Sequence, residues 1–261
     1  MNIKNAVICL FLTFALTFAP PPKNAHGFTE IGTGYLVTSF QSLVTTFLLS
    51  LPADERQAKY IDGYARIFDC DVVEEHYRNE FEWRNIRERI NQRINRIQRE
   101  YFSYYEFIGS VELDTYDFER EVFPLHSESQ LNGVRILSLF RLTLEVGQSR
   151  KYCAHAFGRD SFRLNTFLPT LFTLRLPSSI TVRNIPMTPD AAEHFGRTVE
   201  QDERIGRRRI FLRFRVRLDA IAEITARSES SAENVIFNGQ LLELDAFADR
   251  NMEYHLAKLD I

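Results

Sequence analysis

The spacing of hydrophobic residues changes near Tyr101, and this change constrains the fold more than any other feature of the chain. Before Tyr101, apolar side chains recur every three or four positions, as on one face of an α-helix. After it they recur at every second position, as in a strand with one buried face. Helices followed by strands are typical of α+β domains. We therefore predict an α+β fold in which N-terminal helices pack on a mostly antiparallel β-sheet with one inserted helix.

The helical part is expected over residues 35–101. Its first helix should cover Tyr35 to Leu51, where the hydroxyl-rich composition favours a buried amphipathic helix over a membrane span. A second helix should begin at Pro52, with two acidic residues in its first turn. A third should run from Trp83 to Tyr101, with an arginine-rich flank that we expect to face water; its apolar stripe consists of Trp83, Ile86, Ile90, Ile94, Ile97 and Tyr101.

The β-rich part is expected over residues 102–261. The strictest alternation covers residues 210–218 and is followed by a second apolar run over 221–226. Thr188-Pro189-Asp190 should open the inserted helix, which should continue to about Val199. The Asn238-Gly239 pair predicts a hairpin turn, because both residues tolerate positive φ. Further strands are expected at 105–113, 133–146, 161–168, 170–176 and 179–185.

Residues 1–27 resemble a secretory signal peptide. Lys4 precedes an apolar run of 14 residues, Ala6–Ala19, which is shorter than the roughly 20 residues that a membrane-spanning helix needs. Cleavage after Gly27 would leave residues 28–261 as a single domain. We therefore expect an exported protein, periplasmic or secreted, with no transmembrane span after signal cleavage. The alternative is an N-terminally membrane-anchored protein whose leader stays in place.

The cysteine count agrees with export. Of three cysteines, Cys9 lies inside the leader, so that Cys70 and Cys153 remain as an even pair. Exported proteins fold where cysteines can oxidise. We predict a Cys70–Cys153 disulfide, with two separate buried thiols as the alternative.

Charge excludes one class of partner and singles out one strand. The chain has 32 basic and 35 acidic residues and a formal charge of −3, so we expect no nucleic-acid partner. However, five arginines share one face of the strand at 207–217, and guanidinium groups bind phosphate and carboxylate well. These candidate anion-binding residues are Arg207, Arg209, Arg213, Arg215 and Arg217. The favoured alternative is neutralisation by acids of neighbouring strands, for which the candidates are Glu223, Glu243 and Asp245.

Motifs of catalysis and of cofactor binding are not found. Cys153-x-His155 and an acidic group near Cys70 (Asp69, Asp71, Glu74, Glu75, His76) are possible half-sites for a metal ion. However, the chain lacks the C-x-x-C, H-x-x-x-H and H-E-x-x-H spacings of zinc sites. It also lacks a Gly-x-Ser-x-Gly nucleophile elbow and a phosphate-binding lysine loop. We therefore predict no catalytic residue, no metal ligand and no cofactor.

Several aromatic positions resemble an exported bacterial family that is described only as a domain of unknown function. The resemblance rests on Tyr60, Tyr64-Ala65-Arg66, Asp69-Cys70, Tyr77, Phe81-x-Trp83, Ile86-Arg87 and Tyr116-Asp117-Phe118. It spans most of the mature chain, and its residues are packing residues without a catalytic signature. The resemblance implies export and a single domain, and it implies no activity.

Together these observations predict an exported bacterial envelope protein with a non-enzymatic binding or interaction domain. Its partner would be another envelope protein or an anionic surface. Two alternatives remain open. One is a secreted or periplasmic hydrolase that carries no recognisable motif. The other is a peripheral protein that binds anionic surfaces through the arginine-rich strand.

Overall fold

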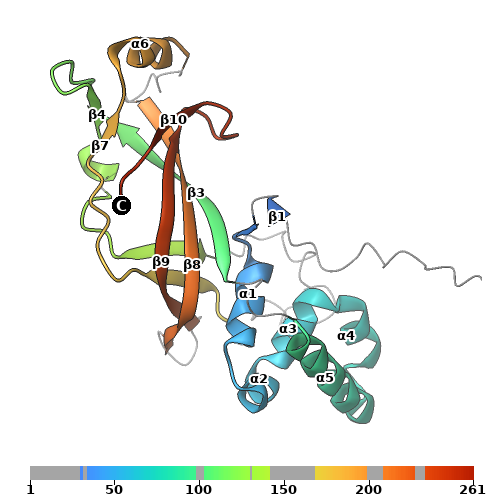
Figure 1. Ribbon diagram of the computed structural model, residues 1–261. Coiled ribbons are helices and arrows are strands. Elements are labelled where there is room, and N and C mark those ends of the chain that lie inside the picture. Colours follow the sequence, from blue (N-terminus) through green and yellow to red (C-terminus); the bar gives the residue numbers. More distant parts are fainter. Residues whose placement is uncertain are drawn as a thin grey trace, which may run out of the picture.

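The computed structural model describes residues 30–31, 34–97, 103–129, 131–141, 168–198, 208–226 and 233–261. The predicted signal peptide, Cys153, His155 and Arg207 lie outside these residues, as do residues 98–102 and residues 161–167 of the strand predicted at 161–168. The fold is α+β, as predicted: five helices precede the longest strands and lie to one side of them (Figure 1). In the described part of the chain, no helix is long and apolar enough to cross a membrane.

The described residues form a main sheet of eight strands. Its order is β1-β2-β3-β8-β9-β6-β5, and β10 also pairs with β9. Only the β2–β3 and β6–β9 pairs are parallel, so the prediction of a mostly antiparallel sheet is confirmed. The strands are β1 (Glu30–Ile31), β2 (Tyr35–Val37), β3 (Tyr104–Leu113), β5 (Ile136–Arg141), β6 (Leu171–Arg175), β8 (Arg208–Ala226), β9 (Glu233–Phe247) and β10 (His255–Lys258).

Strands β8 and β9 form the long central ribbon of the molecule (Figure 1). The alternation predicted over residues 210–218 is confirmed, since the five apolar residues at its even positions are each at most 4% exposed: Ile210, Leu212, Phe214, Val216 and Leu218. The arginines at odd positions, Arg209, Arg213, Arg215 and Arg217, therefore lie on the opposite face of the same strand.

The predicted hairpin at Asn238-Gly239 is wrong, because β9 continues through both residues. Gly239 lies opposite Leu218 of β8, in the middle of the ribbon. A Cβ at this position would stand 2.1 Å from the carbonyl oxygen of Arg217 and 2.7 Å from a methyl group of Leu174. The glycine is thus required by the close approach of a neighbouring strand rather than by positive φ.

In the predicted helical part, the described residues form five helices where three were predicted, because the predicted second helix is divided at Tyr60 and an unpredicted helix begins at Cys70. Tyr35–Leu51 is not one helix, because its first residues pair with β3 as strand β2. The helix begins only after Ser39, whose side chain accepts a hydrogen bond from the backbone N–H of Ser42 in a capping box. The helices are α1 (Phe40–Leu49), α2 (Ala53–Lys59), α3 (Ile61–Phe68), α4 (Cys70–His76), α5 (Glu80–Asn95) and α6 (Pro189–Thr198).

Helix α5 confirms the predicted isoleucine stripe. Trp83, Ile86, Ile90 and Ile94 are each at most 5% exposed. Two arginines of its flank reach carboxylates of the neighbouring helical region: Arg87 pairs with Asp62, and Arg93 pairs with Asp69. The arginine-rich side of α5 is therefore partly neutralised within the helical region.

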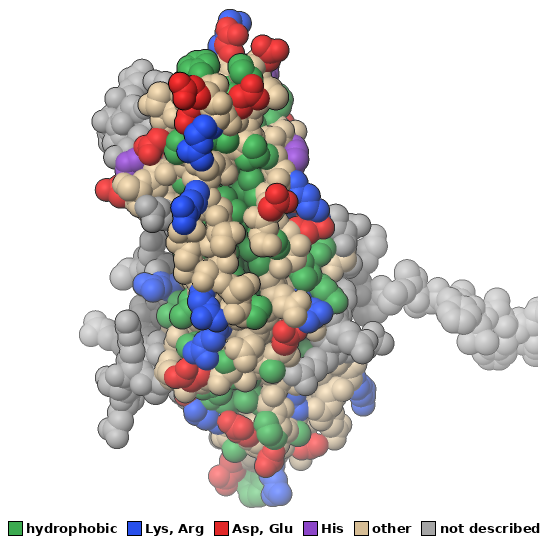
Figure 2. Space-filling model, turned by 60° about the vertical axis from the view of Figure 1, so that its left-hand side comes forward, with side chains coloured by type: hydrophobic (Ala, Val, Ile, Leu, Met, Phe, Trp, Pro, Cys, Tyr) green, Lys and Arg blue, Asp and Glu red, His purple; other side chains and the backbone are tan. Residues whose placement is uncertain are grey.

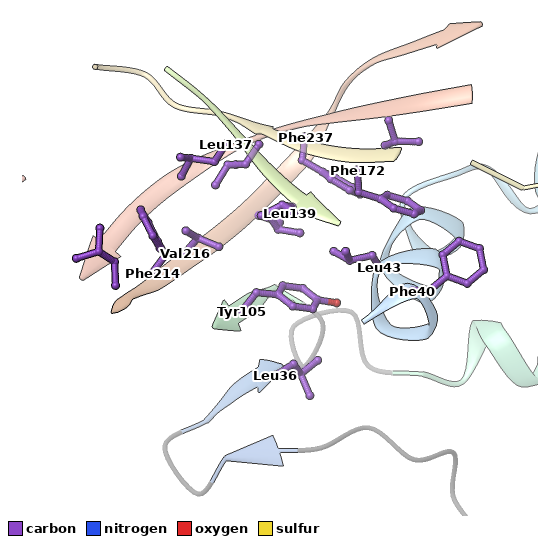
Figure 3. Packing of buried hydrophobic residues seen from close by; sticks show 14 of the residues in the cluster. Leu36, Phe40, Leu43, Tyr105, Leu137, Leu139, Phe172, Phe214, Val216 and Phe237 are labelled. Atoms are coloured by element: carbon purple, nitrogen blue, oxygen red, sulfur yellow. The ribbon is translucent and has the colours of Figure 1, made fainter. Parts of the chain in front are cut away.

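One continuous hydrophobic cluster joins the helices to the sheet (Figure 3). Phe40 of α1 lies 6.3 Å from Phe172 of β6, between ring centroids, and 6.0 Å from Phe140 of β5. The hydroxyl groups of Thr46 in α1 and Tyr105 in β3 are hydrogen-bonded at 2.5 Å. Helix α1 is thus the element that attaches the helical region to the sheet.

A smaller unit lies at one end of the sheet, at the top of Figure 1. It contains the antiparallel pair β4 (Val122–Pro124) and β7 (Asn184–Pro186), together with α6. The Thr188 hydroxyl accepts a hydrogen bond from Ala191 N–H at 3.4 Å, so the predicted start of α6 is confirmed. Strand β7 begins only at Asn184, because the segment before it pairs instead with a turn near Gly133 and Val134.

Strand β5 covers Ile136–Arg141, part of the strand predicted at 133–146. Ile136 is 55% exposed, whereas Leu137 and Leu139 are buried. A register shift between Ser138 and Phe140 breaks the alternation of β5. Residues 142–146 lie outside the described residues.

Candidate functional site

The arginine face of β8 meets carboxylates from the strands on both sides. Arg215 donates hydrogen bonds to Glu106 of β3 at 2.8 Å and to Glu243 of β9 at 2.7 Å. Arg213 donates to Asp245 of β9 at 2.9 Å. The outer arginines also have acidic neighbours: Arg209 lies 3.7 Å from Glu112, and Arg217 lies 2.8 Å from Asp219.

These contacts make the arginine row a network of charge pairs. Burial lowers the pKa of Arg215, but its hydrogen bonds to Glu106 and Glu243 outweigh burial and raise the pKa above the ordinary value. Aromatic rings add support, because Arg213 lies over Phe247 and Arg215 over Tyr35, each 4.9 Å from the ring centroid. Glu243 and Asp245 were expected as partners, whereas Glu223 pairs with Arg175 instead. On the face shown in Figure 2, basic and acidic side chains are interspersed.

An open pocket of about 510 Å³ lies between α6, the loop before β4 and the first residue of β8. Its wall is aromatic: the ring of Tyr116 lies 4.9 Å from the rings of both Phe118 and Phe123, between centroids. The Tyr116 hydroxyl donates a hydrogen bond to Met187 O at 2.6 Å, which holds this ring against β7. We call this the aromatic pocket; it is lined by Thr115, Tyr116, Phe118, Phe123, Pro189, Asp190, Ala192, Glu193, Gly196 and Arg208.

A tight turn presents Phe118 at the rim of the aromatic pocket. The Asp117 carboxylate accepts backbone hydrogen bonds from Glu119 and Arg120, both at 3.0 Å. Glu121 closes the turn with a φ of 53°. Phe118 is 76% exposed as a result. The Tyr116-Asp117-Phe118 motif, which sequence analysis treated only as packing residues, thus builds one wall of the pocket.

Arg208 is the cation of the aromatic pocket. Its guanidinium carbon lies 5.7 Å from the centroid of Phe123. Its Nε atom is buried and has no hydrogen-bond partner among the described residues. Two acids, Asp190 and Glu193, also line the pocket. The pocket therefore offers a flat apolar surface beside a guanidinium group and a partly acidic rim.

A second cluster of polar residues lies where β3 ends. Glu112, His126 and Glu128 bring one possible metal-ligating atom each to within 4.8 Å of one another. Sequence analysis missed this group, because its members have no metal-binding spacing and lie on different elements. The acids near Cys70 behave differently: Asp69 pairs with Arg93, and His76 lies between Glu75 and Glu82. Cys70 itself begins α4.

Comparison with known proteins supplies a family and no activity. No curated protein matches the chain, and no solved structure matches it. A family model described as "Domain of unknown function (DUF4852)" matches residues 57–197, which are 141 of the 261 residues. The matched range runs from α2 to α6 and so includes the arginine-flanked helix α5, the polar cluster and most of the aromatic pocket. Since the match covers more than half of the chain, the protein belongs to this family, Domain of unknown function (DUF4852).

Proposed function

We propose that this protein is an exported bacterial envelope protein with a non-enzymatic binding domain, and that the aromatic pocket is its binding site. The observation that carries the proposal is the pocket itself. A volume of about 510 Å³ is within the range typical of small-ligand sites. Three of its ten lining residues are aromatic, and four have polar or charged side chains: Thr115, Asp190, Glu193 and Arg208. Such sites recognise one group of matching shape rather than an extended surface.

The residues of the aromatic pocket define the chemistry of its ligand. Phe118, which is 76% exposed, offers its ring to a flat apolar group, and the buried ring of Phe123 lies behind the pocket wall. Arg208 also lines the pocket, and a guanidinium group can bind a carboxylate, sulfonate or phosphate beside that group. We therefore propose an aromatic ligand group that carries an anionic substituent, on a small molecule or on the end of a partner protein.

A fluorescent aromatic sulfonate, 8-anilinonaphthalene-1-sulfonate, tests this binding site. We expect the folded protein to bind the probe, and Phe118→Ala and Arg208→Gln each to weaken binding about tenfold, which corresponds to about 1.4 kcal/mol. Phe81→Ala is the matched control, since Phe81 is 77% exposed but lies on α5, away from the pocket. Emission from the single tryptophan, buried Trp83, monitors folding of each variant. Equal binding by Phe118→Ala and Phe81→Ala would contradict the proposal.

Export and the Cys70–Cys153 disulfide belong to the same proposal. They are supported by the leader-like segment 1–27 and by the even pair of cysteines that remains after its removal. We expect protein recovered from the periplasm to begin after Gly27, by intact mass, and to show two more reactive thiols after unfolding with reductant than without it. Recovery only from the cytoplasm, with residues 1–27 and free thiols, would reject export.

A further inference from the structure

We propose that Glu112, His126 and Glu128 form a binding site for a divalent transition-metal ion, with Zn²⁺ as the expected occupant. We call these three residues the carboxylate–histidine cluster. The cluster lies outside the aromatic pocket, and the proposal does not depend on the function assigned to that pocket.

The backbone holds the three residues in one place. His126 N–H donates to the carbonyl oxygen of Glu112 at 2.8 Å, directly after the bridge between Leu113 and Leu125. The Ser129 hydroxyl accepts a hydrogen bond from Glu112 N–H at 2.9 Å. Glu128 lies between these two contacts, in the short 3-10 helix η2 (Ser127–Ser129). The end of β3 and η2 are therefore joined at two points, with the cluster between them.

The side chains can close around an ion with small movements. Their possible ligand atoms lie within 4.8 Å of one another. Atoms that bind Zn²⁺ at about 2.0–2.2 Å stand roughly 3–4 Å apart, so a change of about 1 Å suffices. Glu128 is exposed and can make this movement, whereas the side chains of His126 and Glu112 are only 14% and 20% exposed. The site thus combines two held ligands with one adjustable ligand.

A small movement would bring the Asp114 carboxylate into hydrogen-bonding distance of the imidazole of His126. The Nδ1 atom of His126 accepts a long hydrogen bond from Glu128 N–H, at 3.2 Å. The Nε2 atom on the other edge of the ring lies 3.9 Å from an Asp114 carboxylate oxygen. A metal ion that replaces the long contact at Nδ1 would leave the Nε2 proton facing this carboxylate. Metal-binding histidines are commonly oriented by a carboxylate in this way.

The donor set selects the kind of ion. One imidazole and two carboxylates suit first-row transition metals, whereas Ca²⁺ and Mg²⁺ prefer oxygen ligands alone. Within that series, Zn²⁺ binds more tightly than Mn²⁺ or Fe²⁺ at a given site.

Arg209 lets the proposal predict a gain as well as a loss. Its guanidinium lies 3.7 Å from a carboxylate oxygen of Glu112, and its side chain is 55% exposed. A guanidinium and a metal ion compete for the same carboxylate, and they also repel each other. Removing the arginine charge should therefore strengthen metal binding, which removal of a merely structural contact would not do.

His76 provides a matched control within the same chain. It also has two glutamate neighbours, but its Nδ1 lies 2.9 Å from Glu82 and its Nε2 lies 3.4 Å from Glu75. The two glutamates therefore face opposite edges of the ring and cannot share one ion with it. A histidine with two nearby carboxylates is thus present without the convergent geometry.

The test is calorimetric titration of Zn²⁺ into EDTA-treated full mature protein that has first been treated with iodoacetamide, so that any thiol outside the proposed disulfide is blocked. We expect one bound ion per chain and a rise in thermal stability with Zn²⁺. His126→Asn and Glu128→Gln should weaken binding at least tenfold, Arg209→Gln should strengthen it severalfold, and His76→Asn should leave it unchanged. Glu128→Gln keeps the test valid if His126→Asn fails to fold, because Glu128 is exposed. Wild-type affinity in Glu128→Gln, or weaker binding in Arg209→Gln, would overturn the proposal.

Discussion

Glu106 is the residue on which the arginine face of β8 depends most. It is 3% exposed and lies beside two arginines, 2.8 Å from Arg215 and 3.9 Å from Arg213. A carboxylate so far from water requires such compensation, and the arginines in turn require the carboxylate. An external anion that binds to this face must therefore compete with the carboxylates of Glu106, Glu243 and Asp245 for Arg213 and Arg215.

Replacing Glu106 tests this interdependence. We expect Glu106→Gln to lower the free energy of unfolding by about 3 kcal/mol, because it leaves the partly buried guanidinium of Arg215 with less compensation. Glu223→Gln is the control: Glu223 also pairs with an arginine, but its side chain is 47% exposed, so the cost should stay below about 1 kcal/mol. Urea unfolding of both variants measures the difference. Equal costs would show that burial of Glu106 is energetically unimportant.

The buried phenol of Tyr64 should make the folded protein less stable at alkaline pH. Burial raises its pKa from 10.0 to about 12, although the nearby charge of Arg93 acts in the opposite direction. The folded state therefore favours the neutral phenol, and this contribution is complete below pH 10 and is lost as pH rises from 10 to about 12. In urea unfolding, we expect Tyr64→Phe to lose less stability than wild type between pH 9 and pH 11.5. Parallel losses in the two proteins would contradict this interpretation.

At the scale of elements, β9 shows how a local turn signal is overridden. Asn-Gly is a strong hairpin signal when the chain must reverse. Here the residues on both sides of the pair continue to bond β8, so the extended strand forms throughout the segment. Position 239 has no room for a side chain because Arg217 and Leu174 approach it closely. These neighbours are distant in sequence, so no local pattern predicts them.

Gly239→Ala measures that close approach. We expect a loss of several kcal/mol or failure to fold, because the new Cβ would stand 2.1 Å from a backbone oxygen that cannot move without opening the β8–β9 ribbon. Gly196→Ala is the control. In α6 its Cβ would meet only Arg208 Nη2, at an ordinary 3.6 Å, so the substitution should be neutral or stabilising by up to about 1 kcal/mol. Thermal unfolding distinguishes the two, and equal effects would refute the steric explanation.

At the scale of the whole molecule, the hydrophobic cluster extends from the helices through the sheet to α6. Helix α1 contributes to it through Phe40, and the sheet through Phe172, which is fully buried. Because no polar layer separates the two regions within this cluster, we expect them to unfold together.

Phe172→Ala tests this cooperativity. The substitution creates a cavity in the sheet and should cost about 3–5 kcal/mol. Trp83 lies in α5, on the helical side, so its fluorescence reports a region distant from the substitution. We expect the urea midpoints from Trp83 fluorescence and from far-UV circular dichroism to fall together. A Trp83 midpoint that stays at the wild-type value would mean that the helical region unfolds independently.

The amino-acid sequence by itself determined the α+β class, the isoleucine face of α5, the start of α6 and the inward and outward faces of β8. Each depends on residues within a few positions of one another, since periodicity and capping are local. The same reasoning was wrong at Asn238-Gly239 and at the start of α1, where pairing with a distant strand decides the conformation.

Only the tertiary structure decided which residues meet. Glu106 and Arg215 lie 109 positions apart, and Phe118 and Arg208 reach the same pocket from different elements. Glu112 and His126 come together through the contact between the end of β3 and the segment after β4. Strand register and loop packing determine which of these side chains come into contact, and both depend on the free energy of the whole core. For this reason, the pattern of arginines in β8 is compatible both with an exposed anion-binding row and with a row neutralised by acids. Only the neighbouring strands decide between the two.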